Sequence, residues 1–213
     1  MGKLTISIPT GRMKEESLAL LSRLPQCPPL DLVNSRQLVV EREDLPWRII
    51  FSHPKDSSTY VEFGAADIGI VGKDILLERE NEVYELLELP IGKCTMVLAA
   101  PLSTSREELL KKEALRIATK YPNFTRRYLQ ERGITANIVF LYGSIELAPP
   151  IGLADAIVDL VSTGKTLREN RLQVVEEITP VSGRLVANSI SIKIHSQEIN
   201  FLVEELKEVT SYV

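Results

Sequence analysis

The sequence predicts an α/β protein made of two lobes, each with a mostly parallel sheet, and a central cleft. Short β-branched runs alternate with helical patterns along the chain, which is typical of parallel strands covered by helices. A short motif occurs twice, as GAAD at 64–67 and GLAD at 152–155, and an apolar run follows each copy. This resemblance suggests two lobes of similar build, although two generic helix-to-strand turns would give the same pattern.

The first half of the chain contains strand and helix patterns in pairs. LTISI precedes MKEESLALLSRL, WRIIF precedes SSTYVEF, and DIGIV precedes KDILLERE. The segment 89–101 is apolar and has no helical period, so we expect it to cross from one lobe to the other.

The second half repeats this organisation. LRIAT precedes PNFTRRYLQERG, ANIVFL precedes SIELA, and DAIVDLV precedes STGKTLREN. Pro122 and Gly133 are placed as a helix start and a helix end. A return strand over 172–188 and a helix over 196–209 complete the chain. We therefore expect lobe I at 1–92, continued by 179–213, and lobe II at 93–178.

Composition and charge exclude several classes of protein. There are 25 Lys and Arg against 29 Asp and Glu, without a basic block, so we expect no nucleic-acid partner. The N-terminus lacks a signal-peptide pattern and no apolar run reaches the roughly 18 residues of a membrane span, so we expect a cytoplasmic protein without membrane contact. Cys27 and Cys94 have no partners at metal-ligand spacing, which argues against zinc or a disulfide framework.

The segment DLVSTGKT, 159–166, carries the strongest functional signal. Asp155 and Asp159 lie four residues apart, so on one strand both point to the same side. The loop Ser162, Thr163, Gly164, Lys165 and Thr166 follows the strand and should open a helix, whose N–H groups favour a phosphate. Carboxylates beside such a loop suit a phosphorylated sugar, with ribose hydroxyls or Mg²⁺ on the acids. A nucleotide P-loop is disfavoured because Asp159 occupies the position of its first glycine. A capped helix without a ligand remains the alternative.

Weaker candidates lie elsewhere in the chain. Gly11 and Arg12 follow the first strand, where the forked donors of arginine could meet a phosphate. Glu146 follows another strand and could accept a hydrogen bond from an amino-bearing base or a ribose.

Taken in order, several motifs resemble the ATP phosphoribosyltransferase family in its short, catalytic-subunit form. The motifs are PTGR, DSSTYVEFGAADIGIVGKD, IATKYPNFTRRYLQERG, GSIELAP and GLADAIVDLVSTGKTL. The similarity extends from about residue 4 to the final helix. It implies a fold like that of type II periplasmic binding proteins.

The resemblance also implies a reaction and its partners. ATP and phosphoribosyl pyrophosphate would give phosphoribosyl-ATP and pyrophosphate, with Mg²⁺ held mainly by the substrate phosphates, as the first step of histidine biosynthesis. The 159–166 segment, in lobe II, matches the family's phosphoribosyl pyrophosphate loop. Arg12 and Glu146 match positions on the nucleotide side, and Arg36 matches an arginine that reaches phosphates. A homodimer, and a hetero-octamer with a regulatory subunit resembling histidyl-tRNA synthetase, are implied by the same analogy.

The chain departs from the family pattern at three named positions. Thr10 replaces the usual lysine of PKGR, His53 replaces a lysine or arginine before Pro-x-Asp, and Phe63 replaces a frequent histidine. Losing cations near polyanionic substrates would weaken binding. A catalytically weak paralogue, or a cytoplasmic sensor of a phosphorylated ligand, is therefore the alternative function.

Overall fold

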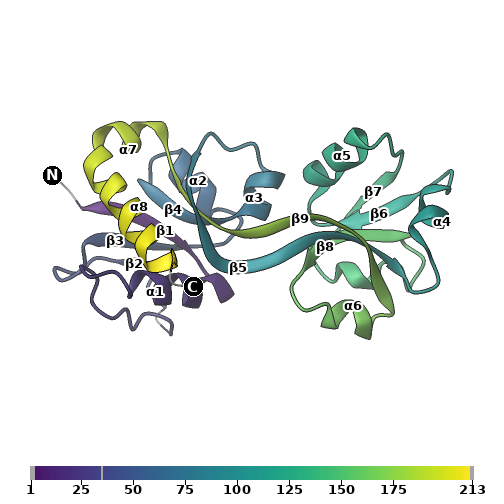
Figure 1. Ribbon diagram of the computed structural model, residues 1–213, viewed down its shortest axis with the longest axis horizontal. Coiled ribbons are helices and arrows are strands. Elements are labelled where there is room, and N and C mark those ends of the chain that lie inside the picture. Colours follow the sequence, from purple (N-terminus) through teal and green to yellow (C-terminus); the bar gives the residue numbers. More distant parts are fainter. Residues whose placement is uncertain (1–2, 35, 212–213) are drawn as a thin grey trace. The chain divides into compact units, whose positions relative to one another are not determined.

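The computed structural model describes residues 3–34 and 36–211 and divides the chain into two compact units. Unit 1 is Met1–Lys93 with Ser182–Val213, and unit 2 is Cys94–Val181. The sequence predicted lobe II at 93–178, so its expected start is one residue earlier than that of unit 2 and its expected end is three residues earlier. Two long strands, β5 (Tyr84–Pro101) and β9 (Leu172–Ala187), run through both units (Figure 1). Each unit is described here by itself.

Unit 1 has a mixed sheet in the order β2, β3, β1, β4, β9. Its strands besides β9 are β1 (Leu4–Pro9), β2 (Val39–Val40), β3 (Trp47–Ser52) and β4 (Ile68–Gly72). β1 is parallel to β3 and to β4, whereas β2 and β9 pair in the antiparallel sense. β1 and β4 are almost wholly buried because helices cover the sheet, which explains their continuous apolar runs.

The helices of unit 1 follow its strands. They are α1 (Arg12–Leu21), α2 (Ser57–Glu62), α3 (Lys73–Glu78), α7 (Ser189–Ile194) and α8 (Ser196–Ser211). The final helix α8 buries Ile199, Leu202 and Leu206 in the core beside Ile6 and Ile49 of the sheet. The spacing of these α8 residues is the period expected for an amphipathic helix.

Unit 2 repeats this arrangement with its own elements. Its sheet has the order β5, β8, β6, β7. The strands β6 (Arg116–Thr119), β7 (Asn137–Phe140) and β8 (Ala156–Val161) are parallel, and β5 pairs with β8 in the antiparallel sense. The helical elements are α4 (Arg106–Leu110), α5 (Pro122–Glu131), the 3₁₀ turn η1 (Ile145–Leu147) and α6 (Lys165–Glu169). The α/β fold class predicted from the sequence is confirmed.

The repeated GAAD and GLAD motifs perform the same structural task in the two units. In unit 1, the Asp67 carboxylate accepts a hydrogen bond from the Thr5 N–H at 2.8 Å, while the Asp67 N–H donates to the Thr5 carbonyl at 2.9 Å. In unit 2, Asp155 makes the same two bonds to Arg116, at 2.9 Å and 2.8 Å. Each aspartate therefore fixes the beginning of a neighbouring parallel strand.

The structure adds elements that the sequence patterns did not indicate. α7 covers the β-branched segment SISIKI, and it forms because the Asn188 side chain accepts hydrogen bonds from the N–H groups of Ile190 and Ser191. The Asn188 amide also donates to the carbonyl of Val61, which holds the cap in place. The helix expected at 144–148 is only the short η1 turn. None of the helices in the described ranges has the length and apolar character needed to cross a bilayer.

Candidate functional site

The loops that follow three parallel strands of unit 2 gather at one edge of its sheet. Open α/β sheets bind ligands at the carboxyl ends of their strands, which is this edge. Lys120 follows β6, Glu146 lies in the segment after β7, and the loop 162–164 follows β8. A cavity of about 230 Å³ lies here, lined by Glu146 and by residues 160–167.

The 162–166 loop presents its polar groups to solvent and to this cavity. Ser162, Thr163, Lys165 and Thr166 are exposed, and Gly164 adopts a left-handed conformation with φ 70°. A side chain at Gly164 would be strained there, and its Cβ would come within 3.1 Å of the Arg168 guanidinium. Because α6 has only five residues, its helix dipole adds little. Individual N–H groups, hydroxyls and the nearby cations are therefore the donors for an anion.

Asp159 is the buried acid of this edge. It lies inside β8, opposite Val97 of β5, and only 6% of its surface is exposed. Its Oδ1 accepts a hydrogen bond from the Leu160 N–H at 2.7 Å. Burial raises the pKa of Asp159, and this effect outweighs the attraction of Lys120, which lowers it. The negative charge of Glu146 raises the pKa of Asp159 further, which places the two acids near each other.

Lys120 is a candidate functional residue that the sequence analysis missed. Its Nζ lies 3.0 Å from Oδ1 of Asp159 and its side chain is mostly buried. The preceding Thr119 donates its hydroxyl to the Val158 carbonyl at 2.7 Å and accepts the Tyr121 N–H at 2.9 Å. These bonds fix the backbone of Lys120 on both sides. The signal in the sequence was its position directly after a strand, which is where Thr10 stands after β1.

Glu146 reaches the cavity because of an unusual backbone turn. Ser144 has φ 49°, a left-handed conformation that non-glycine residues rarely adopt. The turn that follows buries Ile145 in the core and leaves Glu146 half-buried beside the 160–167 segment. The carboxylate can accept hydrogen bonds from an amino group or a hydroxyl.

Asp155 does not join this site. It precedes β8, whereas Asp159 lies near the end of that strand, so the two are separated by about 13 Å along the strand at roughly 3.3 Å per residue. Its carboxylate is 2.7 Å from Lys112 Nζ and also accepts the Arg116 N–H. Although burial raises the pKa of Asp155, these hydrogen bonds outweigh it and the pKa is lowered overall. The sequence analysis grouped the two acids in one site, but Asp155 precedes the start of β8 and Asp159 lies toward its other end.

The other predicted residues lie in unit 1. Gly11 follows β1 with φ 78° and ψ −151°, a region open essentially to glycine, and it precedes the first residue of α1, Arg12. The Arg12 guanidinium is exposed and 3.4 Å from Glu16. Arg36 is exposed in the segment between α1 and β2.

Two of the family departures are neighbours at the same edge of unit 1. β1 and β3 are parallel with Pro9 opposite Ser52, and the Thr10 N–H donates to the Ser52 carbonyl at 2.8 Å. Thr10 and His53 therefore stand side by side at the strand ends, close to where Gly11 and Arg12 begin α1. The His53 side chain is mostly exposed, and Phe63 is 80% exposed at the end of α2.

Comparison with known proteins identifies the family. The model of the family described as HisG, ATP phosphoribosyltransferase, matches residues 53–208. The ATP phosphoribosyltransferase of Geobacillus kaustophilus is 46% identical, over 97% of this chain and 98% of its own length. The chain belongs to the ATP phosphoribosyltransferase family. The relative from Lachnospira eligens is 42% identical over 98% of this chain and 97% of its own. The chain therefore has the length of this family's short members.

Solved structures agree with this membership. The ATP phosphoribosyltransferase HisG:HisZ complex of Thermotoga maritima matches with a TM-score of 0.83 and 34% identity, over 99% of this chain and 100% of that chain. The periplasmic aliphatic sulphonate binding protein SsuA of Escherichia coli matches with a TM-score of 0.65 at 12% identity, covering 99% of this chain and 73% of that chain. At that identity the likeness concerns the fold alone. The predicted resemblance to periplasmic binding proteins is confirmed.

Proposed function

We propose that this ATP phosphoribosyltransferase family member transfers the 5-phosphoribosyl group of phosphoribosyl pyrophosphate to N1 of ATP, as the first step of histidine biosynthesis. Family membership over nearly the whole chain supports the reaction. The structural observation that carries the site assignment is the ion pair of half-buried Lys120 with buried Asp159, beside the exposed 162–166 loop. A buried acid and a cation next to free donors suit a phosphorylated sugar.

The 162–166 loop anchors the 5-phosphate in this proposal. The hydroxyls of Ser162, Thr163 and Thr166, the loop N–H groups and the Lys165 ammonium are all donors, and Gly164 allows close approach. Asp159 holds the ribose hydroxyls, because its carboxylate is fixed by Lys120 and Leu160 at the end of β8. Asp155, which fixes β6 instead, has no place in this assignment.

The reaction needs alignment and charge neutralisation rather than a protein nucleophile. The N1 lone pair of adenine forms a bond to the anomeric carbon as the bond from that carbon to the pyrophosphate oxygen breaks, and the electron pair leaves with pyrophosphate. The positive charge that develops on the sugar is stabilised by nearby carboxylates, Asp159 foremost. We assign Arg12 and Arg36 to the departing pyrophosphate and the triphosphate, and Glu146 to the adenine amino group, with alignment supplied by binding.

Mg²⁺ fits this scheme as an ion carried by the substrates. Among the described residues, no cluster of three or more His, Cys, Asp or Glu side chains is arranged to hold a metal. Mg²⁺ is commonly bound by substrate phosphates with one or two carboxylates, and Asp159 and Glu146 could hold its waters. The ion would neutralise phosphate charge.

We further propose that the chain works in the cytoplasm with a separate regulatory subunit. The Thermotoga maritima relative of similar length was solved as a HisG:HisZ complex. A homodimer of catalytic chains within a hetero-octamer is the assembly that the family resemblance implies. Light scattering of the chain alone and with a co-expressed subunit resembling histidyl-tRNA synthetase tests this.

The decisive experiment mixes the protein with ATP, phosphoribosyl pyrophosphate and Mg²⁺, with and without the regulatory subunit. We expect equimolar pyrophosphate and phosphoribosyl-ATP, identified by mass spectrometry, and much less of both from the Asp159→Asn variant. Tight binding of both substrates without product under either condition would instead support a sensor, and would overturn the proposed activity. The departures at Thr10 and His53 make a slow enzyme the expected outcome for the chain alone.

A further inference from the structure

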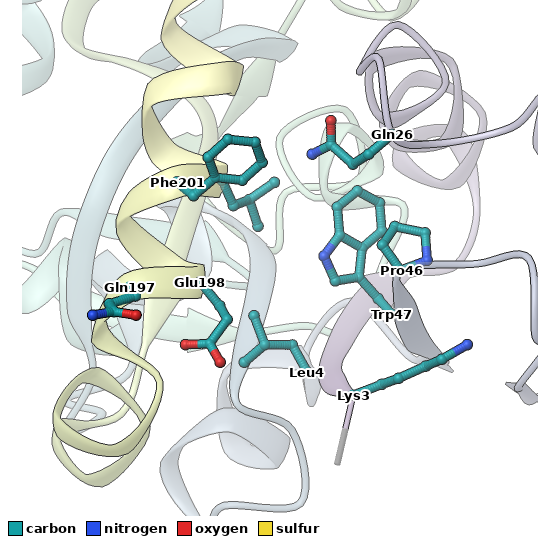
Figure 2. A pocket seen from close by; sticks show the side chains of 9 residues that line it. Lys3, Leu4, Gln26, Pro46, Trp47, Gln197, Glu198 and Phe201 are labelled. Atoms are coloured by element: carbon teal, nitrogen blue, oxygen red, sulfur yellow. The ribbon is translucent and has the colours of Figure 1, made fainter. Parts of the chain in front are cut away.

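A second cavity lies in unit 1, where β1 and β3 begin (Figure 2). It has a volume of about 430 Å³, within the range of small-molecule sites. Leu4 and Trp47, the first residues of β1 and β3, pair in register beneath it. Gly11 and Arg12 follow the opposite end of β1, about 17 Å away at roughly 3.3 Å per residue. The cavity is therefore separate from the substrate residues that unit 1 contributes.

Two aromatic rings form the walls of this cavity. Trp47 enters from β3 and Phe201 enters from α8 (Figure 2). Phe201 is 57% exposed, although the neighbouring Leu202 is buried in the core. The exposed Phe201 ring offers a stacking face to a flat ligand, whereas Trp47 is almost wholly buried.

The Trp47 side chain carries a polar group without a partner in the part of the chain that the structure describes. Trp47 is only 4% exposed, and its indole nitrogen is directed toward the space between α8 and β3 (Figure 2). No hydrogen bond joins this N–H to another described residue. An indole N–H can only donate, so this group can bond to an acceptor on a molecule in the cavity. The cavity therefore favours a ligand with a hydrogen-bond acceptor.

The charges around the cavity exclude a phosphate group. Glu198 contributes a carboxylate from α8, one turn before Phe201, and it lies 3.9 Å from His195 Nδ1. The ammonium of Lys3 points away from the cavity and donates to the carbonyls of Arg42 and Leu45, each at 2.7 Å (Figure 2). The Glu198 carboxylate attracts an amino group and repels an anion.

We propose that this cavity binds a flat nitrogen heterocycle that carries an amino group and no phosphate, such as a nucleoside. The ring stacks on the exposed Phe201, and one of its ring nitrogens or carbonyls accepts a hydrogen bond from the Trp47 N–H. The exocyclic amino group donates to Glu198, and the Gln26 amide, which reaches the cavity from the α1 side, can bond to the rest of the ring edge. This proposal does not depend on the proposed transferase activity.

The chain offers a built-in reporter for the test. Trp47 is the one tryptophan among the 213 residues, so tryptophan emission from the full-length protein reports this cavity. We expect adenosine or cytidine to change the Trp47 emission in a saturable way, and AMP to bind at least about tenfold more weakly than adenosine. No saturable change with either nucleoside, or equal affinity for AMP, would overturn the proposal.

Variants separate binding in the cavity from binding elsewhere. Phe201→Leu and Glu198→Gln should each weaken nucleoside binding about tenfold, since base stacking and a charge-assisted hydrogen bond are lost. Phe63→Leu changes another exposed phenylalanine of unit 1, outside the cavity, and should leave the affinity unchanged. Circular dichroism checks that each variant is folded. Equal affinity of Phe201→Leu and the parent protein would contradict the proposal.

Discussion

At the scale of single residues, Asp159 shows how function opposes stability. Burial raises the pKa of this carboxyl, so folding favours its neutral form. The contribution of the neutral carboxyl to the free energy of unfolding is complete at a pH below the pKa of Asp159 in the unfolded chain. It is lost as the pH rises through the pKa of Asp159 in the folded protein. The charged form of Asp159 is therefore held in the fold at a cost, which Lys120 reduces. Charges kept in this way are typical of functional sites.

The Asp159→Asn variant tests this residue directly. The amide has nearly the same shape but cannot hold a developing positive charge, so turnover should fall more than tenfold, about 1.4 kcal/mol. The melting temperature at pH 7 should stay close to the parent value, because the burial penalty disappears together with the Lys120 attraction. Thr163→Val should show a similar loss of turnover. Near-native rates in both variants would remove the site assignment.

Variants of Lys120 must distinguish a role in substrate binding from a role in holding Asp159 in place. We expect Lys120→Met to raise the KM for phosphoribosyl pyrophosphate and to lower kcat, whereas Lys120→Arg should recover part of the affinity because it keeps the charge. Steady-state kinetics of Lys120→Met, Asp159→Asn and the double variant form a thermodynamic cycle. Additive losses would show that the pair does not act as a unit.

At the scale of elements, residues that fix neighbouring strands lie before the parallel strands, and residues of the proposed site lie at or after their ends. Asp67 and Asp155 stand before β4 and β8 and each holds a neighbouring strand by paired hydrogen bonds. Lys120 and the 162–166 loop stand after β6 and β8, where we propose that the substrate binds. Aspartate thus has different surroundings at the two ends of β8. Asp155 fixes a neighbouring strand, and Asp159 pairs with Lys120.

Asp155→Asn should separate these tasks. The variant loses its ion pair with Lys112, and we expect about 1–2 kcal/mol lower stability at pH 7, measured by urea unfolding. Because the pKa of Asp155 is lowered in the folded protein, the difference should shrink as pH falls through that pKa. The KM values of both substrates should not change. A rise in the KM for phosphoribosyl pyrophosphate would return Asp155 to the binding site.

At the scale of the whole molecule, the two units use one plan twice. The strand order of unit 1, β3-β1-β4-β9, matches that of unit 2, β7-β6-β8-β5, strand by strand. Arg12 then corresponds to Pro122 at the start of α5, and Thr10 corresponds to Lys120. The β4 to α3 turn corresponds to the β8 to α6 loop. Each unit therefore has a cation, Arg12 or Lys120, within three residues of the end of a parallel strand.

The pH dependence of stability should reflect carboxylates in both units. The Ser182 hydroxyl and Arg184 lower the pKa of Glu88, against the opposing effect of burial. For Glu176 burial raises the pKa, but the Arg106 hydrogen bond helps to lower it overall. Groups with lowered pKa stabilise the fold above their unfolded-state values, near 4, and lose this effect as pH falls through the folded values. The melting temperature should be flat from about pH 6 to 8 and fall below about pH 4.5. A maximum below pH 4.5 would contradict this.

The sequence alone determined where most strands and helices lie, because alternation, helical period and turn residues act over a few neighbouring residues. It also located the 162–166 loop for the same reason. Tertiary structure decided the rest. Asp155 lies before β8 and Asp159 lies inside it, so the two carboxylates do not share one site. Lys120 contacts Asp159 because β6 lies beside β8. α7 forms because Asn188 is held by the carbonyl of Val61, far away in the sequence. Contacts between distant segments depend on strand order, which no local pattern encodes.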